Sequence, residues 1–240
     1  TDLTIGGNVV DDNSDFRYLE AEERVNNIIE KAEFYGYSGE RVKGLIFCSR
    51  NDEAKILSNK FNEKGFSTIA LSGADSNEAR ENAIGRLEQN YEDNKLDYIF
   101  TVDIFNEGVD IPAVNQIIML RPTESAIIFV QQLGRGLRHY KDKEYVIVLD
   151  FIGSYQKNFF IPMALSGDKT YNKDNLRKFV TLGTRVIPGA STVNFDEISK
   201  NRIFSAIDSA RFNENKVIIE AYSNLKVMLG RIPELDDFDN

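Results

Sequence analysis

An apolar run that passes through a tight turn directly into an amphipathic helix restricts the fold of this chain more than any other feature. The run V-K-G-L-I-F-C-S at Val42–Ser49 is almost continuously apolar, as in the strands of a parallel sheet that is covered on both faces. Asn51 is expected to cap the helix that follows, and Gly65 is expected to end it. The core-facing positions of this helix recur at helical spacing and are Ala54, Leu57 and Phe61. A strand that leads at once into a helix is the repeating unit of an α/β fold.

Four further apolar runs extend this pattern along the chain. They are Phe66–Leu71, Asp97–Val102, Asn115–Leu120 and Glu144–Phe151. A helix is expected between the first two, where Asp75 and Glu78 have the spacing of a capping box. Because strands alternate with helical segments, the sequence predicts a parallel sheet flanked by helices.

The segment before this alternation is expected to contain a loop and one helix. Residues 1–13 are rich in glycine, aspartate and asparagine, which favour a loop or a frayed entry. Ser14 or Asp15 is expected to cap a helix that Gly36 stops. The expected core face of this helix is Val25, Ile28, Ile29, Ala32 and Tyr35. No chemistry is evident in it.

After Ile152 the alternation ends and the pattern becomes mainly helical. Helices are expected over Gly153–Leu165, Asn172–Leu182, Ile198–Ala210 and Val217–Leu229, with a turn at Pro188-Gly189 and a short strand over Thr192–Phe195. The predicted organisation is therefore a linker and helix over 1–40, the α/β domain over 41–165, and a mainly helical C-terminal extension over 166–240.

Composition excludes several classes of protein. The chain has no uncharged apolar run of about 18 residues and no signal-peptide pattern at its start, so no membrane partner is expected. Cys48 is the single cysteine, which excludes an internal disulfide and a cysteine-based zinc site and fits the reducing cytoplasm, the expected location. His139, the only histidine, has no cysteine or histidine partner, so no metal site is predicted in this chain.

The net charge of −9 is unevenly distributed. Residues 1–40 hold 10 acidic against 3 basic residues, and residues 231–240 hold 4 against 1. The segment between them is therefore nearly neutral. Overall charge neither supports nor excludes DNA or RNA as a partner, and a groove for a phosphate backbone would have to be a local feature.

Residues 126–138 combine an apolar helix face with a pair of arginines. At about 100° per residue, Gln131, Arg135 and Arg138 point one way. The opposite face carries Ala126, Phe129, Val130, Leu133 and Leu137. Two guanidinium groups one turn apart on a rigid element are suited to grip phosphate oxygens during phosphoryl transfer. Taken alone, such a pair is more often a solvated helix face.

The segment T-V-D-I-F-N-E-G-V-D-I-P at Thr101–Pro112 precedes this helix. Together with Q-x-x-x-R-x-x-R it resembles motifs V and VI of superfamily 2 helicases and translocases, the DEAD/DEAH-related motors, and among them the restriction-enzyme-subunit type. The resemblance runs from about Val42 to Phe151. It implies a RecA-like fold and the role of a second motor domain in a nucleic-acid helicase.

The resemblance also implies a nucleotide site that is shared with another domain. In such motors ATP binds between two RecA-like halves, so Arg138 is the expected arginine finger and Arg135 the expected contact of the γ-phosphate. Gln131 is expected to help orient the site. In the loop before this helix, the nucleotide-binding positions are Glu107, Gly108 and Asp110. Gly108 and Asp110 correspond to positions at the nucleotide and its ribose, whereas Glu107 stands where many relatives have arginine. Asp110 is alternatively an ordinary loop acid.

Five residues match positions that contact nucleic acid in this family. G-L-I-F-C-S-R resembles motif IV and places Ser49 and Arg50 along a nucleic-acid strand. Ser72-Gly73 followed by Arg80 looks like motif IVa, which places Gly73 and Arg80 near a phosphate, although a simple capped helix start is an equal alternative. By the same resemblance, Thr101 of motif V meets a nucleic-acid phosphate.

The motifs of a first motor domain do not occur in this sequence. It has no P-loop, and Asp52-Glu53-Ala54-Lys55, which looks like a DEAD box, opens a helix and is expected to cap it. ATP and Mg²⁺ are therefore expected to be held mainly by an N-terminal RecA-like domain of the same polypeptide, and the isolated chain is expected to be inactive. Nucleic acid is the expected partner, with DNA favoured over RNA. The ending G-R-I-P-x-x-x-D-F resembles the opening of a further helicase-associated module, so the natural protein is expected to continue.

Two other functions remain open at this point. The first is a binding or regulatory module that keeps the motor fold without catalysis, although the intact arginines argue against decay. The second is a nucleoside-phosphate enzyme complete in this chain, such as a small kinase. It would need its own phosphate loop, and Gly167-Asp168-Lys169-Thr170 lacks both the spacing and a preceding strand.

Overall fold

The structure is a computed structural model of the chain. It describes residues 4–5, 8–9, 22–90, 94–102, 111–121, 140–151, 160–166, 172–182, 193–209, 222, 225–226 and 231–232. The chain divides into two compact units. The first consists of Thr1–Pro122 with Val130–Gln156, and the second of Thr123–Phe129 with Lys157–Asn240.

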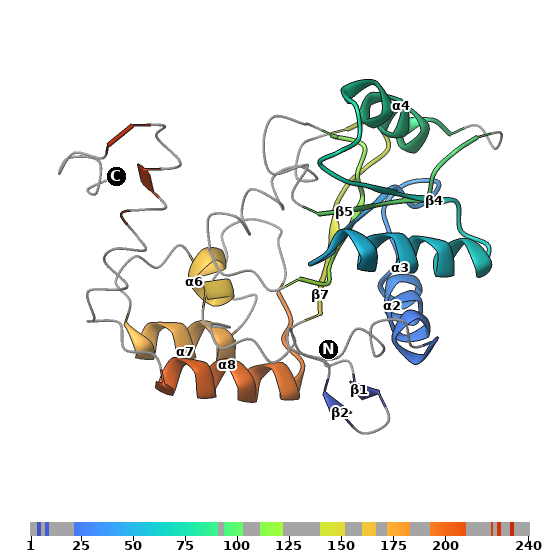
Figure 1. The fold of residues 1–240 in the computed structure, drawn as a ribbon. Coiled ribbons are helices and arrows are strands. Elements are labelled where there is room, and N and C mark those ends of the chain that lie inside the picture. Colours follow the sequence, from blue (N-terminus) through green and yellow to red (C-terminus); the bar gives the residue numbers. More distant parts are fainter. Residues whose placement is uncertain are drawn as a thin grey trace. The chain divides into compact units, whose positions relative to one another are not determined.

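A five-stranded parallel sheet forms the centre of the first unit (Figure 1). Its strands are β3 (Gly44–Phe47), β4 (Thr68–Leu71), β5 (Tyr98–Thr101), β6 (Gln116–Met119) and β7 (Ile147–Asp150). They lie in the order β4-β5-β3-β6-β7, and every neighbouring pair is parallel. The predicted RecA-like parallel sheet is confirmed, and each predicted apolar run contains one of its strands.

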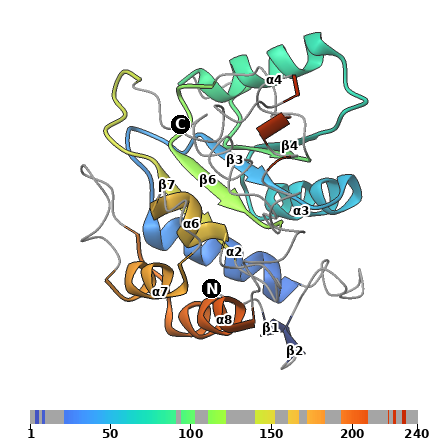
Figure 2. The same ribbon diagram turned by 90° about the vertical axis from the view of Figure 1, so that its left-hand side faces the viewer.

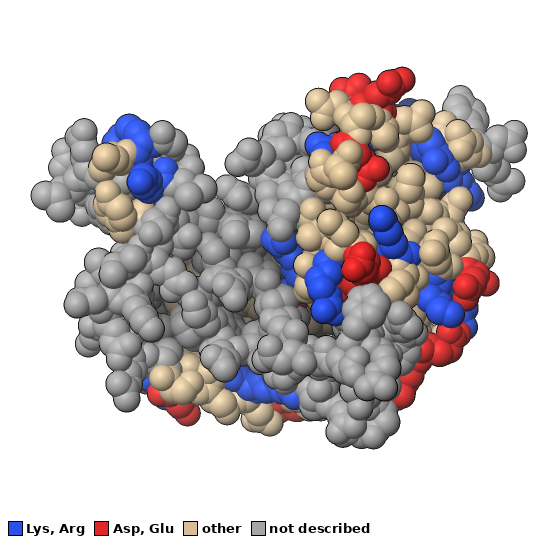
Figure 3. All heavy atoms as spheres, in the orientation of Figure 1, with Lys and Arg blue, Asp and Glu red and all other residues tan. Residues whose placement is uncertain are grey.

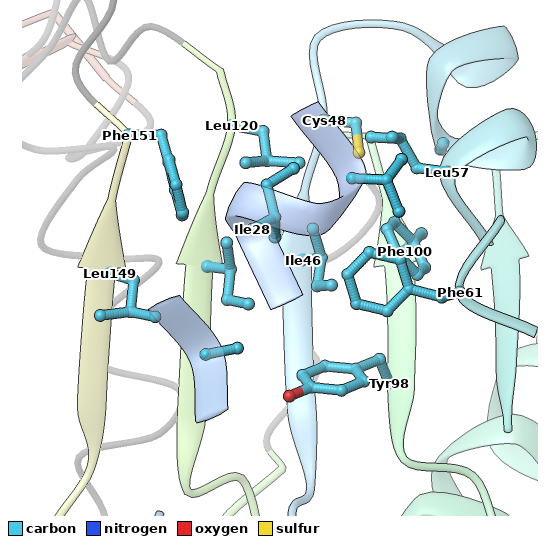
Figure 4. Close-up of a cluster of buried hydrophobic side chains, with 14 of the residues drawn as sticks. Ile28, Ile46, Cys48, Leu57, Phe61, Tyr98, Phe100, Leu120, Leu149 and Phe151 are labelled. Carbon is cyan, nitrogen blue, oxygen red and sulfur yellow. The ribbon is translucent and has the colours of Figure 1, made fainter. Parts of the chain in front are cut away.

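Three helices cover the sheet. Two of them, α2 (Glu22–Tyr35) and α3 (Asn51–Glu63), lie on one face, and α4 (Asn77–Glu88) lies on the other (Figures 1 and 2). Alternate residues of each strand point to opposite faces. The α2 and α3 side is lined by Val25, Ile28, Ile46, Cys48, Leu57, Phe61, Tyr98, Phe100, Ile118, Leu120, Leu149 and Phe151. Figure 4 shows these side chains in register, with Cys48, Leu120 and Phe151 near the carboxyl ends of the strands and Tyr98 near the amino ends. This face is therefore a continuous apolar core.

At two positions a residue other than glycine would destabilise the fold, for a different reason in each case. Gly36 follows the last turn of α2 with φ +67, the left-handed conformation of a helix stop. Gly44 begins β3, where an added Cβ would lie 2.2 Å from Cδ1 of Tyr98 on the neighbouring strand. The glycine in β3 therefore makes room for a packed tyrosine ring.

The structure corrects several local predictions in the first unit. The segment expected as a loop contains a short antiparallel pair, β1 (Thr4–Ile5) with β2 (Asn8–Val9). Tyr35, expected in the core, is 50% exposed because it lies in the last turn of α2. The first helical residue of α3 is Asn51 itself, and Arg50 is its N-cap. The N-cap of α4 is Ser76, whose hydroxyl accepts from the Ala79 amide, so Asp75 was one position too early.

The second unit contains three described helices: α6 (Phe160–Ser166), α7 (Lys173–Leu182) and α8 (Glu197–Ser209). The apolar faces of α7 and α8 bury Leu176, Phe179, Val180, Ile203, Ala206 and Ile207. Arg177 of α7 forms ion pairs with Asp174 and with Asp208 of α8. Residues 193–196 have no regular structure, so the short strand predicted over Thr192–Phe195 is wrong within this range. Most of the predicted helix Val217–Leu229, the turn at Pro188-Gly189 and the cap at Ser14 or Asp15 lie outside the described residues.

Candidate functional site

The carboxyl ends of all five strands meet at one edge of the sheet. The register aligns Leu71, Thr101, Phe47, Met119 and Asp150 in a single row across it. From β3 the chain passes to β4, returns to β5, and then crosses to β6 on the other side of β3. Open α/β sheets bind ligands beyond their carboxyl ends, where the strand order reverses in this way. We therefore call this row and the segments that follow it the carboxyl edge.

Six of the predicted nucleotide-site residues belong to segments that continue from this edge. The loop after β5 and the segment after residue 121 carry them. Glu107, Gly108, Asp110, Gln131, Arg135 and Arg138 all lie outside the described residues, as does His139. Their roles stay predictions.

The turn after β3 exposes two of the predicted nucleic-acid residues. Ser49 and Arg50 are both exposed, and they directly follow the buried strand residue Cys48. The Ser49 amide donates to Oε2 of Glu53 at 2.9 Å, so a side chain from the first turn of α3 fixes this turn. The tetrapeptide at 52–55 lies in the first turns of α3, as the sequence predicted.

The loop between β4 and α4 brings exposed Gly73 and half-buried Arg80 together. Arg80 donates to the carbonyl of Gly73 at 2.9 Å, so both predicted residues lie at the N-terminus of α4. Asp75 accepts from the amide and hydroxyl of Ser72 at 2.6 and 2.8 Å. These hydrogen bonds are the main reason why the pKa of Asp75 is lowered, and the nearby charges of Lys55 and Arg80 lower it further.

Lys55 is a functional candidate that the sequence analysis missed. It is exposed on the first turns of α3, and its charge acts on Asp75 in the loop after β4. The signal in the sequence was its position one turn after Asn51, at the same end of the helix as Ser49 and Arg50. Lys55 and Arg80 thus place two cations beside the loop that holds Gly73. Such cations suit phosphate oxygens, which attract positive charge and accept hydrogen bonds.

Thr101 is placed differently from the remaining four nucleic-acid residues. Its side chain has no exposed surface, because it ends β5, an inner strand between β4 and β3. Direct contact with a phosphate would require this edge to open. The Thr101 hydroxyl has no hydrogen-bond partner among the described residues. Asp150, in the same row on β7, also has a buried oxygen without such a partner, and burial raises the pKa of this carboxyl to about 7.

Charge is distributed in small groups over the described surface of this unit. Figure 3 shows lysine and arginine side chains interspersed with acidic ones on the face in view, without a continuous basic surface. This agrees with the nearly neutral central segment of the sequence. Positive charge on this face is therefore local and not continuous.

The described residues include groups whose chemistry suits phosphate. They are the exposed residues Arg50 and Gly73 and the half-buried Arg80. Within the described part of the chain, no three acidic, histidine or cysteine side chains gather as metal ligands would. The described helices also include none with the length and apolar character that a membrane span requires. The five-stranded parallel sheet flanked by helices is the fold of the RecA-like domains of helicases.

Comparison with known proteins gives the family. Residues 23–140 match the helicase conserved C-terminal domain. This part of the chain belongs to the superfamily 2 helicases, the DEAD/DEAH-related group, and is their C-terminal RecA-like domain. The predicted family is confirmed.

Relatives and solved structures agree with this assignment. IRC3 of Saccharomyces cerevisiae, which is named as an ATP-dependent helicase, is 28% identical over 131 residues, 54% of this chain and 18% of IRC3. A fragment named as an HsdR subunit of a type I restriction enzyme from Vibrio vulnificus has a TM-score of 0.50 at 20% identity, covering 63% of this chain and 32% of the fragment. The yeast DEAD-box splicing factor Prp28 also has a TM-score of 0.50, at 17% identity, covering 80% of this chain and 36% of Prp28. The two structures show the shared fold. Because the match spans less than a fifth of IRC3, the activity of the whole protein is a matter of proposal.

Proposed function

We propose that this chain is the second motor domain of an ATP-dependent nucleic-acid helicase or translocase, and that its carboxyl edge serves both the nucleotide and the nucleic-acid strand. The observation that supports this most directly is the arrangement of that edge. Two exposed turns, at Ser49–Arg50 and at Gly73 with Arg80, lie at the ends of strands in one parallel sheet. The remaining motif residues follow β5 and residue 121 in the sequence.

The nucleotide part of the proposal assigns roles to residues of this chain only. ATP, held with Mg²⁺ mainly by an N-terminal RecA-like domain of the same polypeptide, supplies the phosphoanhydride that is hydrolysed. Arg138 serves as the arginine finger, Arg135 holds the γ-phosphate, and Gln131 orients the site. Gly108 and Asp110 lie at the nucleotide and its ribose, next to Glu107. Guanidinium groups suit this role because they stay charged and grip phosphate oxygens through two parallel hydrogen bonds.

The nucleic-acid part rests on the exposed turns. Ser49, Arg50 and Gly73 contact the phosphates of one strand, with positive charge from Arg80 and Lys55. Thr101 lies beneath this surface and contacts a phosphate only if the edge opens when the strand binds. Closing the cleft on ATP and reopening it after hydrolysis would move the two domains along the strand. DNA is favoured over RNA because the motifs resemble those of restriction-enzyme subunits, although Prp28 is named as a splicing factor.

The test joins this chain to its natural N-terminal half and measures nucleic-acid-stimulated ATP hydrolysis. Arg138→Ala should lower turnover by roughly 10³ or more, because an arginine finger stabilises the transition state by that amount. Arg86→Ala is the matched control, since Arg86 lies in the last turn of α4 and donates to the Asn94 carbonyl. Its turnover should stay at the wild-type level. Unchanged turnover in Arg138→Ala would remove the finger role. No nucleic-acid-stimulated hydrolysis by the joined wild-type protein would favour a module that binds without catalysis.

A further inference from the structure

One carboxylate bridges the N-terminal helix and the turn that follows β3. Glu53, in the first turn of α3, accepts from Nη1 of Arg24 in α2 at 2.8 Å through Oε1. Its other oxygen, Oε2, accepts from the Ser49 amide at 2.9 Å. The side chains of Arg24 and Glu53 are only 3% and 2% exposed. Both oxygens of Glu53 are therefore engaged, one by each segment, within the protein interior.

Stability alone is a weak explanation for such a pair. Two charges removed from water lose their hydration, and well-packed apolar residues of similar size often stabilise a protein as well or better. The neighbouring Cys48 has no exposed surface, and this burial raises the pKa of its thiol. An apolar pair could pack α2 against α3, but it could not also accept a hydrogen bond from the Ser49 amide. The carboxylate is rigid and planar, so a shift of Arg24 must move the oxygen that holds Ser49.

We infer that Glu53 is a positioning residue that couples α2 to the nucleic-acid contact at Ser49 and Arg50. The helix α2 directly precedes the parallel sheet in the chain. A shift of α2 would therefore change the geometry of the exposed turn at Ser49 and Arg50. The inference rests on the proposed function, because it assumes that Ser49 and Arg50 contact nucleic acid. Asp52, exposed in the same turn of α3, carries the same charge without this bridge and provides an internal comparison.

The test measures the affinity of the 240-residue chain for fluorescein-labelled single-stranded oligothymidylate and oligouridylate at several salt concentrations. Glu53→Gln should weaken binding about tenfold, because its amide group can accept from only one of the two partners. The slope of log affinity against log salt should also fall by about 0.7, the value of one phosphate contact on a single strand. Asp52→Asn removes the same charge and should bind as the wild type or slightly more tightly.

A charge swap separates positioning from stability. In the double variant Arg24→Glu/Glu53→Arg the ion pair is restored, so the melting temperature should return towards that of the wild type. Binding should stay weak, because arginine cannot accept the Ser49 amide. Recovery of binding in the swap would overturn the inference, as would equal affinities of Glu53→Gln and Asp52→Asn. The second comparison decides the matter if the swap fails to fold. Absence of oligonucleotide binding by the wild-type chain would overturn both the proposed nucleic-acid role and the inference. Wild-type binding that is unchanged in Glu53→Gln would overturn the inference alone.

Discussion

The two edges of the parallel sheet differ in how far their buried polar groups are hydrogen-bonded. At the amino edge, where the strands begin, buried polar side chains are tied into backbone hydrogen bonds. At the carboxyl edge, polar atoms are left without partners among the described residues. Since unpaired buried polar groups are costly and uncommon in folded proteins, their concentration at one edge points to function there.

Side chains close the amino edge by binding backbone groups. Asn115 accepts from the Lys43 amide at 2.8 Å and donates to the carbonyls of Ser38 and Arg41. Gln116 donates to the carbonyls of Ala32 and Gly36 and accepts from the Tyr98 hydroxyl. At the end of α4, the guanidinium of Arg41 donates to the carbonyls of Leu87, Gln89 and Leu96. These contacts join loops, strands and helix ends into one rigid layer.

The carboxyl edge has the opposite character. The buried side-chain atoms without partners in the described part of the chain are Nε of Arg24, Oδ1 of Asn27, Nε of Arg80, Oγ1 of Thr101 and Oδ2 of Asp150. Thr101 and Asp150 end β5 and β7, and Arg80 lies in the first turn of α4. Arg24 and Asn27 lie in the first half of α2, where Arg24 pairs with Glu53 at the start of α3. The comparison teaches that folding completes one edge, whereas the other keeps groups available for ligands or for the rest of the protein.

The largest expected effect concerns the amino edge. Asn115→Leu keeps the size of the side chain but leaves three backbone groups unpaired, each of which costs about 1 kcal/mol or more. We expect the free energy of unfolding, measured by urea denaturation, to fall by roughly 3 kcal/mol. Asn90→Leu is the control, because Asn90 is exposed and its change should stay within about 0.5 kcal/mol. Equal effects of the two variants would mean that the amino edge is not specially stabilised.

The next prediction tests the carboxyl edge through the pH dependence of stability. The pKa of Asp150 is raised to about 7, above the value of about 3.9 expected in the unfolded chain. The folded state therefore binds more protons between these values, and the stability from this group, complete below about pH 4, is lost as pH rises through about 7. Asp150→Asn should remove this loss. The free energy of unfolding of the variant, minus that of the wild type, should therefore rise by roughly 1 to 3 kcal/mol between pH 4 and pH 8.

Denaturation curves at several pH values measure this difference. Asp52→Asn, which changes an exposed carboxylate, should show no comparable growth with pH. A constant difference between Asp150→Asn and the wild type across the range would show that this carboxyl ionises normally in the folded protein.

The smallest expected effect compares the two ends of one helix. Lys55 lies at the end of α3 near the carboxyl edge, whereas Lys60 lies in its last turn. Lys55→Ala should weaken binding of single-stranded oligonucleotide about fivefold and reduce its salt dependence, because one phosphate contact is lost. Lys60→Ala should bind as the wild type. The reverse ranking would move the nucleic-acid surface away from the carboxyl edge.

The sheet was predictable from sequence because its strands are short, apolar and separated by clear helix signals. The predicted runs Val42–Ser49 and Asn115–Leu120 each contain a strand near their centres. The caps were less predictable, since Asp75 and Ser76 are both good N-cap residues and the competing hydrogen bonds of Ser72 decide between them. Residues 193–196 failed as a strand because they have no neighbouring strand in the described part of the chain.

The site was only partly predictable. Motif positions predicted Ser49, Arg50, Gly73 and Arg80 as contacts of nucleic acid. The structure places them at one edge of the sheet, with Arg80 half-buried and the other three exposed. They did not reveal the burial of Thr101, because exposure depends on neighbouring strands that are distant in sequence. The pair formed by Arg24 and Glu53 spans 29 positions along the chain, and no local pattern connects these residues.

The most direct test of the account is hydrogen exchange of the backbone amides with and without a single-stranded oligonucleotide. The account predicts slower exchange in peptides that cover residues 48–53 and 72–80 when the strand is bound. Peptides that cover residues 36–43 and 140–146, at the amino edge, should exchange at unchanged rates. Protection confined to the amino edge would contradict the assignment of the carboxyl edge as the nucleic-acid surface.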